Sequence, residues 1–295
     1  MDHPLSPGAR FRKLLEAGTV VAPGAFNALS ARLVEATGFD AVYISGAGVT
    51  NSLTAMPDIA LITLTEMAQQ CRYICNAVSI PCIADADTGY GDILNVARTV
   101  QEFEAARLAG MHLEDQVSPK RCGHLEGKQV VDPKEMAMKI AAAVRSRRDP
   151  DFFVIARTDA RGVNDFDDAV DRALLYMDAG ADAIFPEALQ SKEEFAEFAR
   201  RAPAALLANM TEFGKSPLLT VEELTTLGYK MVIFPMTQLR VMMRAAELLL
   251  TEIKATGTQQ AFVDQMQSRA DLYELVRYLE FTAFDREVAD SVAGD

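Results

Sequence analysis

The sequence FFVIARTDARGVNDFDDAVDRALLYMDAGADAIFPE, residues 152–187, carries the pattern from which the fold can be predicted. It contains an apolar run at Phe152–Arg157, a segment of helical periodicity at Asp167–Ala179, a glycine at position 180 and a second apolar run at Ala183–Glu187. Glycine is usual just past the end of a helix. Continuous apolar strands separated by a helix are typical of a parallel sheet that is covered on both faces. We therefore predict two parallel strands joined by a helix.

The same alternation continues in both directions along the chain. Eight apolar runs bounded by turn residues or charges are predicted strands: Thr19–Ala22, Ala41–Ser45, Cys82–Asp85, Met111–Glu114, Phe152–Arg157, Ala183–Glu187, Ala205–Asn209 and Met231–Pro235. A helix is predicted after each of them: Asn27–Gly38, Leu64–Val78, Leu94–Ala109, Pro133–Arg147, Asp167–Ala179, Lys192–Arg201, Val221–Leu227 and Leu239–Ala255. Eight such units predict an α/β fold of the (β/α)8 TIM-barrel type. The first strand is expected to end early, at Pro23-Gly24.

A further helical segment follows the eighth unit. It spans Phe262–Glu280, after Gly257 and a polar break, and its apolar face is formed by Met266, Leu272, Leu275, Val276 and Leu279. Such a face packs either on the parent domain or on a neighbouring subunit. We therefore divide the chain into a catalytic barrel, residues 1–256, and a C-terminal helical tail, residues 257–295.

Composition excludes several classes of function. The chain has 295 residues, 49% of them hydrophobic, and a formal net charge of −13. This acidic balance argues against a nucleic-acid or anionic-membrane surface, because both require a basic footprint. No apolar run approaches the ~20 residues of a spanning helix. We expect a soluble cytosolic protein, in which an anionic substrate needs a locally basic site or a bound cation.

The segment Lys120–Lys128 stands out among the predicted loops. It combines cations, a thiol, an imidazole, a carboxylate and two glycines. It is either an ordinary solvated loop or a mobile catalytic loop, in which cations bind an anionic substrate and favour the thiolate of Cys122. Cys71, Cys75 and Cys82 lie in apolar patterns and are predicted to be buried. A zinc site is disfavoured, since no second Cys/His pair at zinc spacing accompanies Cys122.

The active site of a barrel of this type lies at the carboxyl ends of its strands. The polar residues predicted at or just beyond those ends, together with the intervening Gly46, are Tyr43, Ser45, Gly46, Asp85, Asp87, Glu114, Asp115, Arg157, Glu187, Asn209, Thr237 and Arg240. Carboxylates gathered from several strands repel one another, and a hard divalent ion resolves this. Oxygen ligands favour Mg²⁺, with Mn²⁺ as an alternative. Asp58 is a further candidate ligand.

Basic and small residues at the same end suit an anionic substrate. Arg157, Arg240 and His124 are candidates to bind substrate carboxylates. The segment Ser45-Gly46-Ala47-Gly48 offers backbone N–H groups to an oxyanion. Alternatively, the arginines pair with the acidic residues in a structural role. The chain has no phosphate-binding glycine loop and no dinucleotide fingerprint.

These motifs together resemble those of the isocitrate lyase and phosphoenolpyruvate mutase superfamily, and most closely its 2-methylisocitrate lyase branch. The matching stretches are Tyr43-Ile-Ser-Gly46, Asp85-Ala-Asp-Thr-Gly-Tyr-Gly91, His112-Leu-Glu-Asp-Gln116, Lys120-Arg-Cys-Gly-His124, Ala156-Arg-Thr-Asp159, Phe185-Pro-Glu187, Asn209-Met-Thr-Glu-Phe-Gly214 and Gly257-Thr-Gln259. The resemblance implies a Mg²⁺-dependent retro-aldol cleavage of 2-methylisocitrate to pyruvate and succinate. It also implies a homotetramer in which the C-terminal helices are exchanged between subunits.

Site residues follow from the same resemblance. Asp85 would contact the metal directly, and its waters would be held by Asp87, Glu114 and Asp58. The pyruvate half would be bound by Ser45, Gly46 and Arg157, and the succinate carboxylates by His124, Asn209, Thr237 and Arg240. Cys122 would protonate the carbanion-like product, as suits a thiol of near-neutral pKa. Tyr43 joins Cys122 and Arg157 as a catalytic candidate, and the substrate-binding set also includes Ala47, Gly123 and Glu187.

The loop motif does not choose the substrate by itself. Lys120-Arg-Cys-Gly-His124 is shared with proteins similar to 2,3-dimethylmalate lyase and to carboxyphosphoenolpyruvate phosphonomutase, and an oxaloacetate-acting enzyme is a further alternative. Thr211-Glu-Phe-Gly214 and Arg240 favour methylisocitrate, the latter because it can bind an additional carboxylate. The predicted activity is therefore a carbon–carbon lyase.

Overall fold

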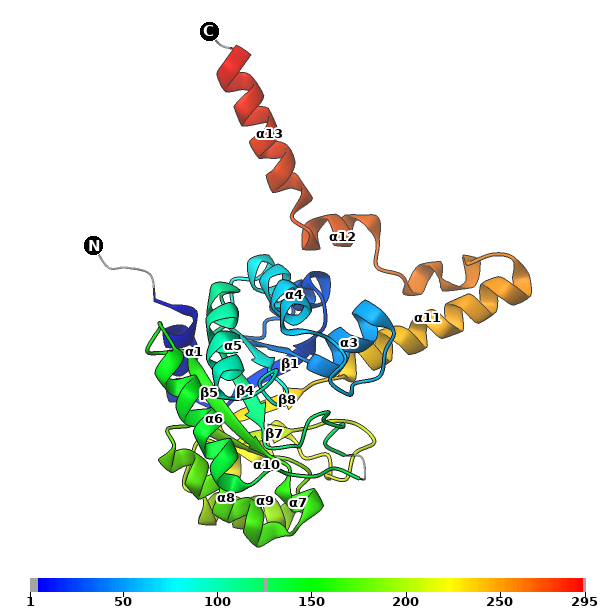
Figure 1. Cartoon of the computed structure of the whole chain (residues 1–295). Coiled ribbons are helices and arrows are strands. Elements are labelled where there is room, and N and C mark those ends of the chain that lie inside the picture. Colours follow the sequence, from blue (N-terminus) through cyan, green and yellow to red (C-terminus); the bar gives the residue numbers. More distant parts are fainter. Residues whose placement is uncertain (1–4, 125–126, 294–295) are drawn as a thin grey trace. The chain divides into compact units, whose positions relative to one another are not determined.

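Eight parallel strands form one sheet in the computed structural model, which describes residues 5–124 and 127–293 (Figure 1). The strands are β1 (Val20–Ala25), β2 (Val42–Ile44), β3 (Cys82–Asp85), β4 (Gly110–Glu114), β5 (Phe153–Thr158), β6 (Ala183–Pro186), β7 (Leu207–Asn209) and β8 (Met231–Phe234). Their order is β6-β5-β4-β3-β2-β1-β8-β7. The two end strands are joined by a parallel bridge between Ile184 and Leu206. The predicted (β/α)8 barrel is confirmed, as a nearly closed ring.

Helices cover the outside of this ring. They are α2 (Ala28–Ala36), α4 (Leu64–Ala77), α5 (Ile93–Ala105), α6 (Pro133–Ser146), α8 (Phe166–Asp178), α9 (Lys192–Arg201) and α10 (Val221–Thr226). Two short helices, α3 (Gly46–Thr54) and α7 (Ala160–Val163), replace stretches that were predicted as loops. Ser45 starts α3, because its hydroxyl oxygen accepts a hydrogen bond from the Gly48 N–H at 3.1 Å. Serine is a strong N-cap residue, so the glycines that follow it enter a helix.

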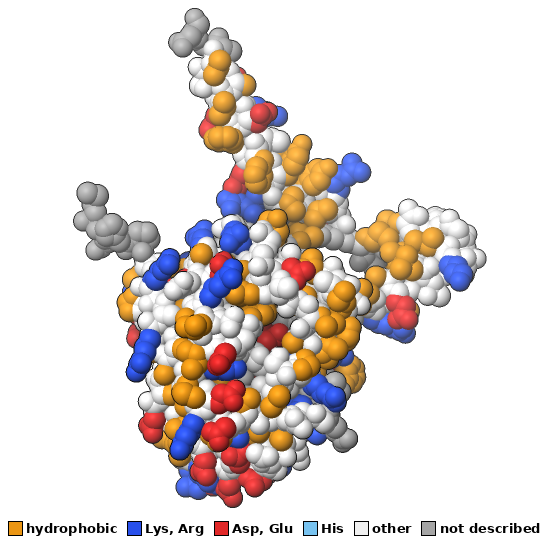
Figure 2. All heavy atoms as spheres, in the orientation of Figure 1, with side chains coloured by type: hydrophobic (Ala, Val, Ile, Leu, Met, Phe, Trp, Pro, Cys, Tyr) orange, Lys and Arg blue, Asp and Glu red, His pale blue; other side chains and the backbone are white. Residues whose placement is uncertain are grey.

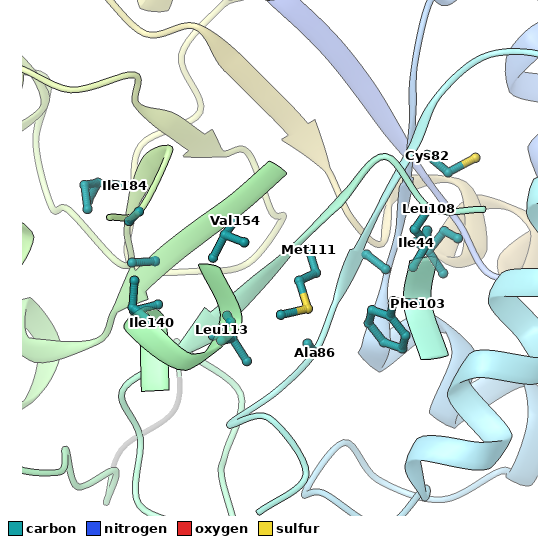
Figure 3. Close-up of a cluster of buried hydrophobic side chains, with 14 of the residues drawn as sticks. Ile44, Cys82, Ala86, Phe103, Leu108, Met111, Leu113, Ile140, Val154 and Ile184 are labelled. Carbon is teal, nitrogen blue, oxygen red and sulfur yellow. The ribbon is translucent and has the colours of Figure 1, made fainter. Parts of the chain in front are cut away.

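Apolar side chains fill two separate layers of the barrel. The inner layer, inside the ring of strands, includes Tyr43, Ile155 and Phe185. The outer layer lies between strands and helices, where Met111 and Leu113 of β4 pack near Val154 and Ile140 (Figure 3). Because alternate residues of each strand face opposite layers, continuous apolar runs are required. The three cysteines predicted to be buried, Cys71, Cys75 and Cys82, belong to the outer layer.

Helix α1 (Pro7–Ala17) precedes the first strand and was absent from the sequence-based prediction. Ser6 caps its N-terminus, with a proline at the first position. Phe11 is fully buried, and its ring lies 5.3 Å from that of Phe153 at the start of β5. This helix therefore packs against the inner layer near the strand starts, at the opposite end from the strand termini predicted to form the site.

The first strand is longer than predicted. It runs through Pro23 and Gly24 to Ala25, and Pro23 pairs in register with Phe234 of β8. A Cβ atom on Gly24 would lie 2.1 Å from the carbonyl oxygen of Pro235. Gly24 thus allows the two backbones to approach closely, and the Pro-Gly pair continues the strand where it was expected to end it.

The chain divides into two compact units, Met1–Leu239 and Arg240–Asp295. This division falls near the start of α11 (Thr237–Thr256). The end of the catalytic barrel at residue 256, which was expected from the sequence, stays a prediction. The predicted helical segment, Phe262–Glu280, consists of a 3₁₀ turn, α12 (Arg269–Leu275) and the start of α13 (Tyr278–Ala293). Ser268 begins α12 with a capping box, and Arg277, at φ 59°, separates α12 from α13.

Large apolar side chains of the second unit are exposed to solvent. They include Met243, Leu250, Leu279, Phe281 and Phe284, and Figure 2 shows hydrophobic side chains gathered along these segments. Among the helices of the described residues, none combines the length and the apolar character needed to cross a membrane.

Candidate active site

Residues at the carboxyl ends of the strands, and in the loops that follow them, line one cavity of the first unit. Residues predicted from the sequence line most of it: Tyr43, Ser45, Ala47, Asp58, Asp85, Cys122, Gly123, His124, Arg157, Glu187 and Asn209. The other lining residues are Lys120, Phe185, Thr211, Pro235 and Met236. The barrel therefore brings together residues that are far apart in the sequence, as parallel strand ends do.

Acidic side chains gather at one side of the cavity. Asp85 ends β3 and Glu114 ends β4, and both are buried. The backbone N–H of Asp87 donates a hydrogen bond to Asp85 Oδ1 at 2.9 Å, with Asp87 itself at φ 46°. Lys120 Nζ lies 2.5 Å from Asp58 Oδ1 and 2.9 Å from Asp87 Oδ1. The loop lysine is therefore buried among the predicted metal ligands.

Burial dominates the protonation of these acids, because desolvation disfavours a charged carboxylate. It raises the pKa of Asp87 to about 6, although Lys120 opposes the shift. Burial also raises the pKa of Asp85 and, well above its usual value, that of Glu114, although Lys120 and Arg157 oppose both shifts. For Lys120, burial alone would lower the pKa, but the surrounding carboxylates outweigh it and raise the pKa. Lys120 and Arg157 thus offset only part of the desolvation of these acids.

The same acids fit a hard cation. Both carboxylate oxygens of Glu114, and Oδ1 of Asp87, are buried without a hydrogen-bond partner. Two of these oxygens still have an ion-pair contact, Asp87 Oδ1 with Lys120 and Glu114 Oε2 with Arg157. Buried carboxylate oxygens of this kind are the donors that Mg²⁺ takes directly or through its waters. Within residues 5–124 and 127–293, no three His, Cys, Asp or Glu side chains form a group that could hold an ion. A Mg²⁺ site that uses one or two direct carboxylates and several waters does not require such a group.

Arg157 is the centre of a buried ion-pair network that includes Glu114. Its guanidinium lies 2.9 Å from Asp159, 3.3 Å from Glu114 and 3.7 Å from Glu187. It also lies over the ring of Phe185, 5.1 Å from its centroid. These contacts match the alternative interpretation, in which the arginine pairs with acidic residues. They leave open a second role toward a substrate, because Arg157 also lines the cavity.

The described part of the loop that begins at Lys120 contacts this network through His124. Leu125 and Glu126 lie outside the described residues. His124 Nε2 is 3.0 Å from Glu187 Oε1, and the backbone N–H of Lys215 donates to His124 Nδ1 at 3.0 Å. Because Nδ1 accepts this hydrogen bond, the proton of a neutral imidazole belongs on Nε2, toward Glu187. The amide of Asn209 donates to Glu187 at 3.2 Å.

Residues 11–254 match the phosphoenolpyruvate phosphomutase family. The chain belongs to this family. A curated relative from Aeropyrum pernix, named 2-methylisocitrate lyase, is 52% identical over 284 residues, which is 96% of this chain and 91% of that protein. A relative from Eubacterium barkeri, named 2,3-dimethylmalate lyase, is 43% identical over 273 residues, 92% of this chain and 94% of that protein. The superfamily inferred from the sequence motifs is therefore confirmed.

Solved structures of related proteins share the same fold. Oxaloacetate acetylhydrolase in complex with 3,3-difluorooxalacetate is 37% identical, with a TM-score of 0.90 and coverage of 99% of both chains. Phosphonopyruvate hydrolase in complex with oxalate and Mg²⁺ is 30% identical, with a TM-score of 0.84 and coverage of 98% of this chain and 99% of that one. The family fold thus extends over nearly the whole of this chain.

In this phosphomutase-family chain, Cys122 differs from the other three cysteines by being exposed. Protein atoms packed around its sulfur still desolvate the thiol and raise its pKa, although a hydrogen bond from the His124 backbone opposes the shift. The sequence suggested a favoured thiolate or a thiol of near-neutral pKa, and this expectation is wrong. The cation-rich sequence was misleading because Lys120 pairs with carboxylates instead. Cys122 is a protonated thiol at neutral pH.

Tyr43 belongs to the inner layer and also lines the cavity. The hydroxyl oxygen is 2.8 Å from His112 Nε2, and that nitrogen is 3.6 Å from Asp85 Oδ1. Burial raises the pKa of Tyr43 well above its usual value, and lowers the pKa of His112 to about 3. At neutral pH both groups are uncharged, so Tyr43 is suited to donate a hydrogen bond.

Other predicted site residues of this family member lie outside the cavity wall. Gly46 begins α3, where an added Cβ would lie 2.7 Å from Asp85 Oδ2, so its role is to allow close packing. Asp87 and Glu114 lie behind the wall and contact Lys120 and Arg157. The hydroxyl of Thr237 donates to Glu212. Arg240 lies in the second unit and is exposed, and its role stays a prediction.

Several residues of the site were missed by the sequence reasoning. Lys128 and Asp159 form a buried ion pair beside Arg157, and His112 contacts Tyr43. A signal existed for the first two, since Lys128 closes the charged loop and Asp159 stands two residues beyond Arg157. His112 begins the matching stretch His112-Leu-Glu-Asp-Gln116, but it lies within a predicted strand and was not singled out as a site residue.

Proposed function

We propose that this chain is a metal-dependent carbon–carbon lyase that cleaves 2-methylisocitrate to pyruvate and succinate. The observation that carries the proposal is the closed loop, which places the Cys122 thiol in the wall of a cavity shared with Arg157 and Asp85. A relative with the name 2-methylisocitrate lyase, 52% identical across almost the entire chain, supports this substrate.

The proposed reaction breaks one carbon–carbon bond and moves one proton. The substrate hydroxyl loses its proton, its oxygen becomes the keto oxygen of pyruvate, and the electron pair of the broken bond passes to the succinate carbon. A buried carboxylate at the strand ends takes the hydroxyl proton and then releases it to solvent. Cys122, protonated at neutral pH, returns a proton to the carbanion. The Cys122 thiolate then regains a proton from solvent, so atoms and charge balance and both groups return to their starting states.

The remaining residues bind and orient the substrate in this proposal. Ser45, Gly46 and Ala47 border the pyruvate half, together with Arg157 and the Tyr43 hydroxyl. His124, Glu187 and Asn209 form a hydrogen-bonded group suited to the succinate half, and Gly123 brings the loop backbone onto it. Thr237 and Arg240 are proposed to bind the outer carboxylates.

Lyases of this superfamily depend on a metal ion, and we assign Mg²⁺, with Mn²⁺ as the alternative. Asp85 would hold it directly, and Asp87, Glu114 and Asp58 would hold its waters. The ion, when bound, would stabilise negative charge on the substrate oxygens. The related hydrolase structure that contains oxalate and Mg²⁺ supports this choice.

The direct test is the release of pyruvate and succinate from 2-methylisocitrate, measured with and without EDTA. Turnover that EDTA abolishes and Mg²⁺ restores is expected. A relative named 2,3-dimethylmalate lyase and a structural neighbour named oxaloacetate acetylhydrolase favour two alternatives. Faster turnover of 2,3-dimethylmalate or oxaloacetate than of 2-methylisocitrate would replace the proposed substrate. A phosphonate substrate, followed by ³¹P NMR, tests the phosphonomutase alternative.

Metal binding is expected to depend on pH. Below about pH 6 Asp87 is protonated, so an ion that needs its carboxylate must displace a proton. We expect Mg²⁺ to raise the Tm more at about pH 8 than at about pH 5. In the metal-free protein the pH dependence has the opposite sign. Because the pKa of Asp87 is raised on folding, this residue contributes less to the free energy of unfolding as pH rises from about 4 to about 6. An equal Mg²⁺ effect at both pH values would remove Asp87 from the metal site.

The second unit supports a proposal about assembly. Its exposed side chains include Leu279, Phe281 and Phe284 at 77%, 69% and 68% exposure, which is unusual for an isolated chain. We assign these helices to contacts between subunits of a homotetramer with exchanged C-terminal helices. Light scattering on the full-length chain should give four times the mass of one chain, and a monomer would contradict the assignment.

A further inference from the structure

Lys128 is a buried ammonium group that does not belong to the cavity wall. Its side chain is 2% exposed, and its Nζ lies 2.6 Å from Asp159 Oδ1. The same Nζ donates to the carbonyl oxygen of Gly123, five residues earlier in the loop. It also lies beside Gly162 of α7, where an added Cβ would be 3.2 Å away. One cation therefore joins the loop to the segment that follows β5.

Asp159 is held rigidly from the other side. Its carboxylate accepts hydrogen bonds from Arg157 at 2.9 and 3.2 Å, so it is shared between Arg157 and Lys128. Its backbone N–H donates to Asp115 Oδ1 at 2.8 Å, and the second Asp115 oxygen accepts from Tyr176 at 2.8 Å. The attachment point of Lys128 is thus fixed to β4, β5 and α8.

The carbonyl that Lys128 binds belongs to the residue next to Cys122. At Gly123 the loop approaches the site so closely that an added Cβ would lie 2.2 Å from Glu187 Oε1 and 2.3 Å from Arg157 Nη2. We propose that Lys128 and Asp159 are positioning residues, which hold the loop backbone at Gly123 against Arg157 and Glu187 and so set the position of the Cys122 thiol. Lys120, paired with Asp58 and Asp87, holds the start of the same loop.

Stability alone does not account for this ion pair. A buried ion pair contributes little net stability relative to apolar side chains of similar volume, because both charges lose their hydration. Its geometric effect is direct, since a loop fixed at Lys120 and at Gly123 holds Cys122 between two anchors. A displacement of about 1 Å in a catalytic group can cost about 100-fold in rate. The kinetic part of this inference rests on the lyase function proposed above, and the thiol-labelling part does not.

The test compares Lys128→Met in the full-length chain with the wild type. Cys122 is labelled with iodoacetamide at one fixed pH, and peptide mapping separates it from the three buried cysteines. Release of the loop should increase the labelling rate about tenfold, because a more hydrated thiol has a larger thiolate fraction. The kcat for 2-methylisocitrate should fall about 100-fold, with a much smaller change in KM. Lys128→Arg, which keeps the charge, should recover part of both effects.

Lys134→Met provides the matched control, since Lys134 is an exposed lysine at the start of α6 and should change neither quantity. A folded Lys128→Met protein with wild-type labelling would overturn the proposal. If Lys128→Met does not fold, Lys128→Gln is expected to show the same increase in labelling, and wild-type labelling there would equally overturn it. Faster labelling in a chain that fails to cleave 2-methylisocitrate would support the loop anchor and reject the proposed substrate.

Discussion

Replacement of Cys122 by serine is expected to lower kcat about 1,000-fold, because general acid catalysis contributes 10²- to 10⁴-fold and a serine hydroxyl is a much weaker acid. Cys122 is the one cysteine that lines the cavity within the described residues, and burial raises its pKa. A raised pKa keeps the thiol protonated at neutral pH, as a proton donor requires. Steady-state kinetics with 2-methylisocitrate and saturating Mg²⁺ measure the effect.

Three controls separate proton transfer from other causes. Cys75→Ala, at a buried position of α4, should leave kcat unchanged. Cys122→Ser should keep the increase in Tm produced by Mg²⁺, because the thiol is not a proposed ligand. The wild-type kcat should fall as pH rises through the raised pKa of Cys122, since the donor is then deprotonated, and this alkaline limb should be absent in the variant. An unchanged kcat in Cys122→Ser would exclude the acid role.

The sequence predicted the fold well because each strand of a parallel barrel is apolar on both faces. The resulting apolar runs located the eight strands, and with them the strand ends that carry Asp85, Glu114 and Arg157. Local capping was harder to interpret. The segment after Ser45 was expected to offer backbone N–H groups to an oxyanion, but the helix α3 that Ser45 caps was not predicted. The helical segment predicted at Phe262–Glu280 is divided in the same way, because Ser268 caps the N-terminus of α12.

Ion pairing was the part of the site that residue types alone could not define. The charged loop suggested cations available to a substrate, but Lys120 and Lys128 are both buried against carboxylates. Their partners Asp87 and Asp159 come from other strand ends, so the pairing depends on three-dimensional distances. The protonated state of Cys122 follows chiefly from desolvation of the thiol, which raises its pKa, while Lys120 and Lys128 are already paired with carboxylates. The charged residues of the sequence therefore predicted where the site lies, but they did not predict its ion pairs or the protonation of Cys122.

The largest loss of stability is expected for Arg157→Met. This change leaves Glu114, Asp159 and Glu187 buried with one cation fewer, and removal of one partner from a buried ion pair costs about 3–5 kcal/mol. Activity should be lost as well, since Arg157 lines the cavity. The free energy of unfolding, measured by urea denaturation at about pH 7.5, tests the first effect.

The pH dependence of that loss distinguishes charge from packing. In the wild type, burial alone would raise the pKa of Glu187, but Arg157 and His124 outweigh it and lower the pKa, so this carboxylate adds stability above its unfolded pKa that is lost as pH falls. Without Arg157, burial should raise the pKa of Glu187, and stability should instead fall as pH rises from about 4 to about 7. The destabilisation of Arg157→Met is therefore expected to be smaller at about pH 4.5 than at about pH 7.5.

Arg161→Met is the matched control, because Arg161 pairs with the partly exposed Glu194 at 2.6 Å and its replacement should cost about 0–1 kcal/mol at either pH. An equal loss for Arg157→Met at both pH values would mean that its contacts with Phe185, rather than its charge, stabilise the site.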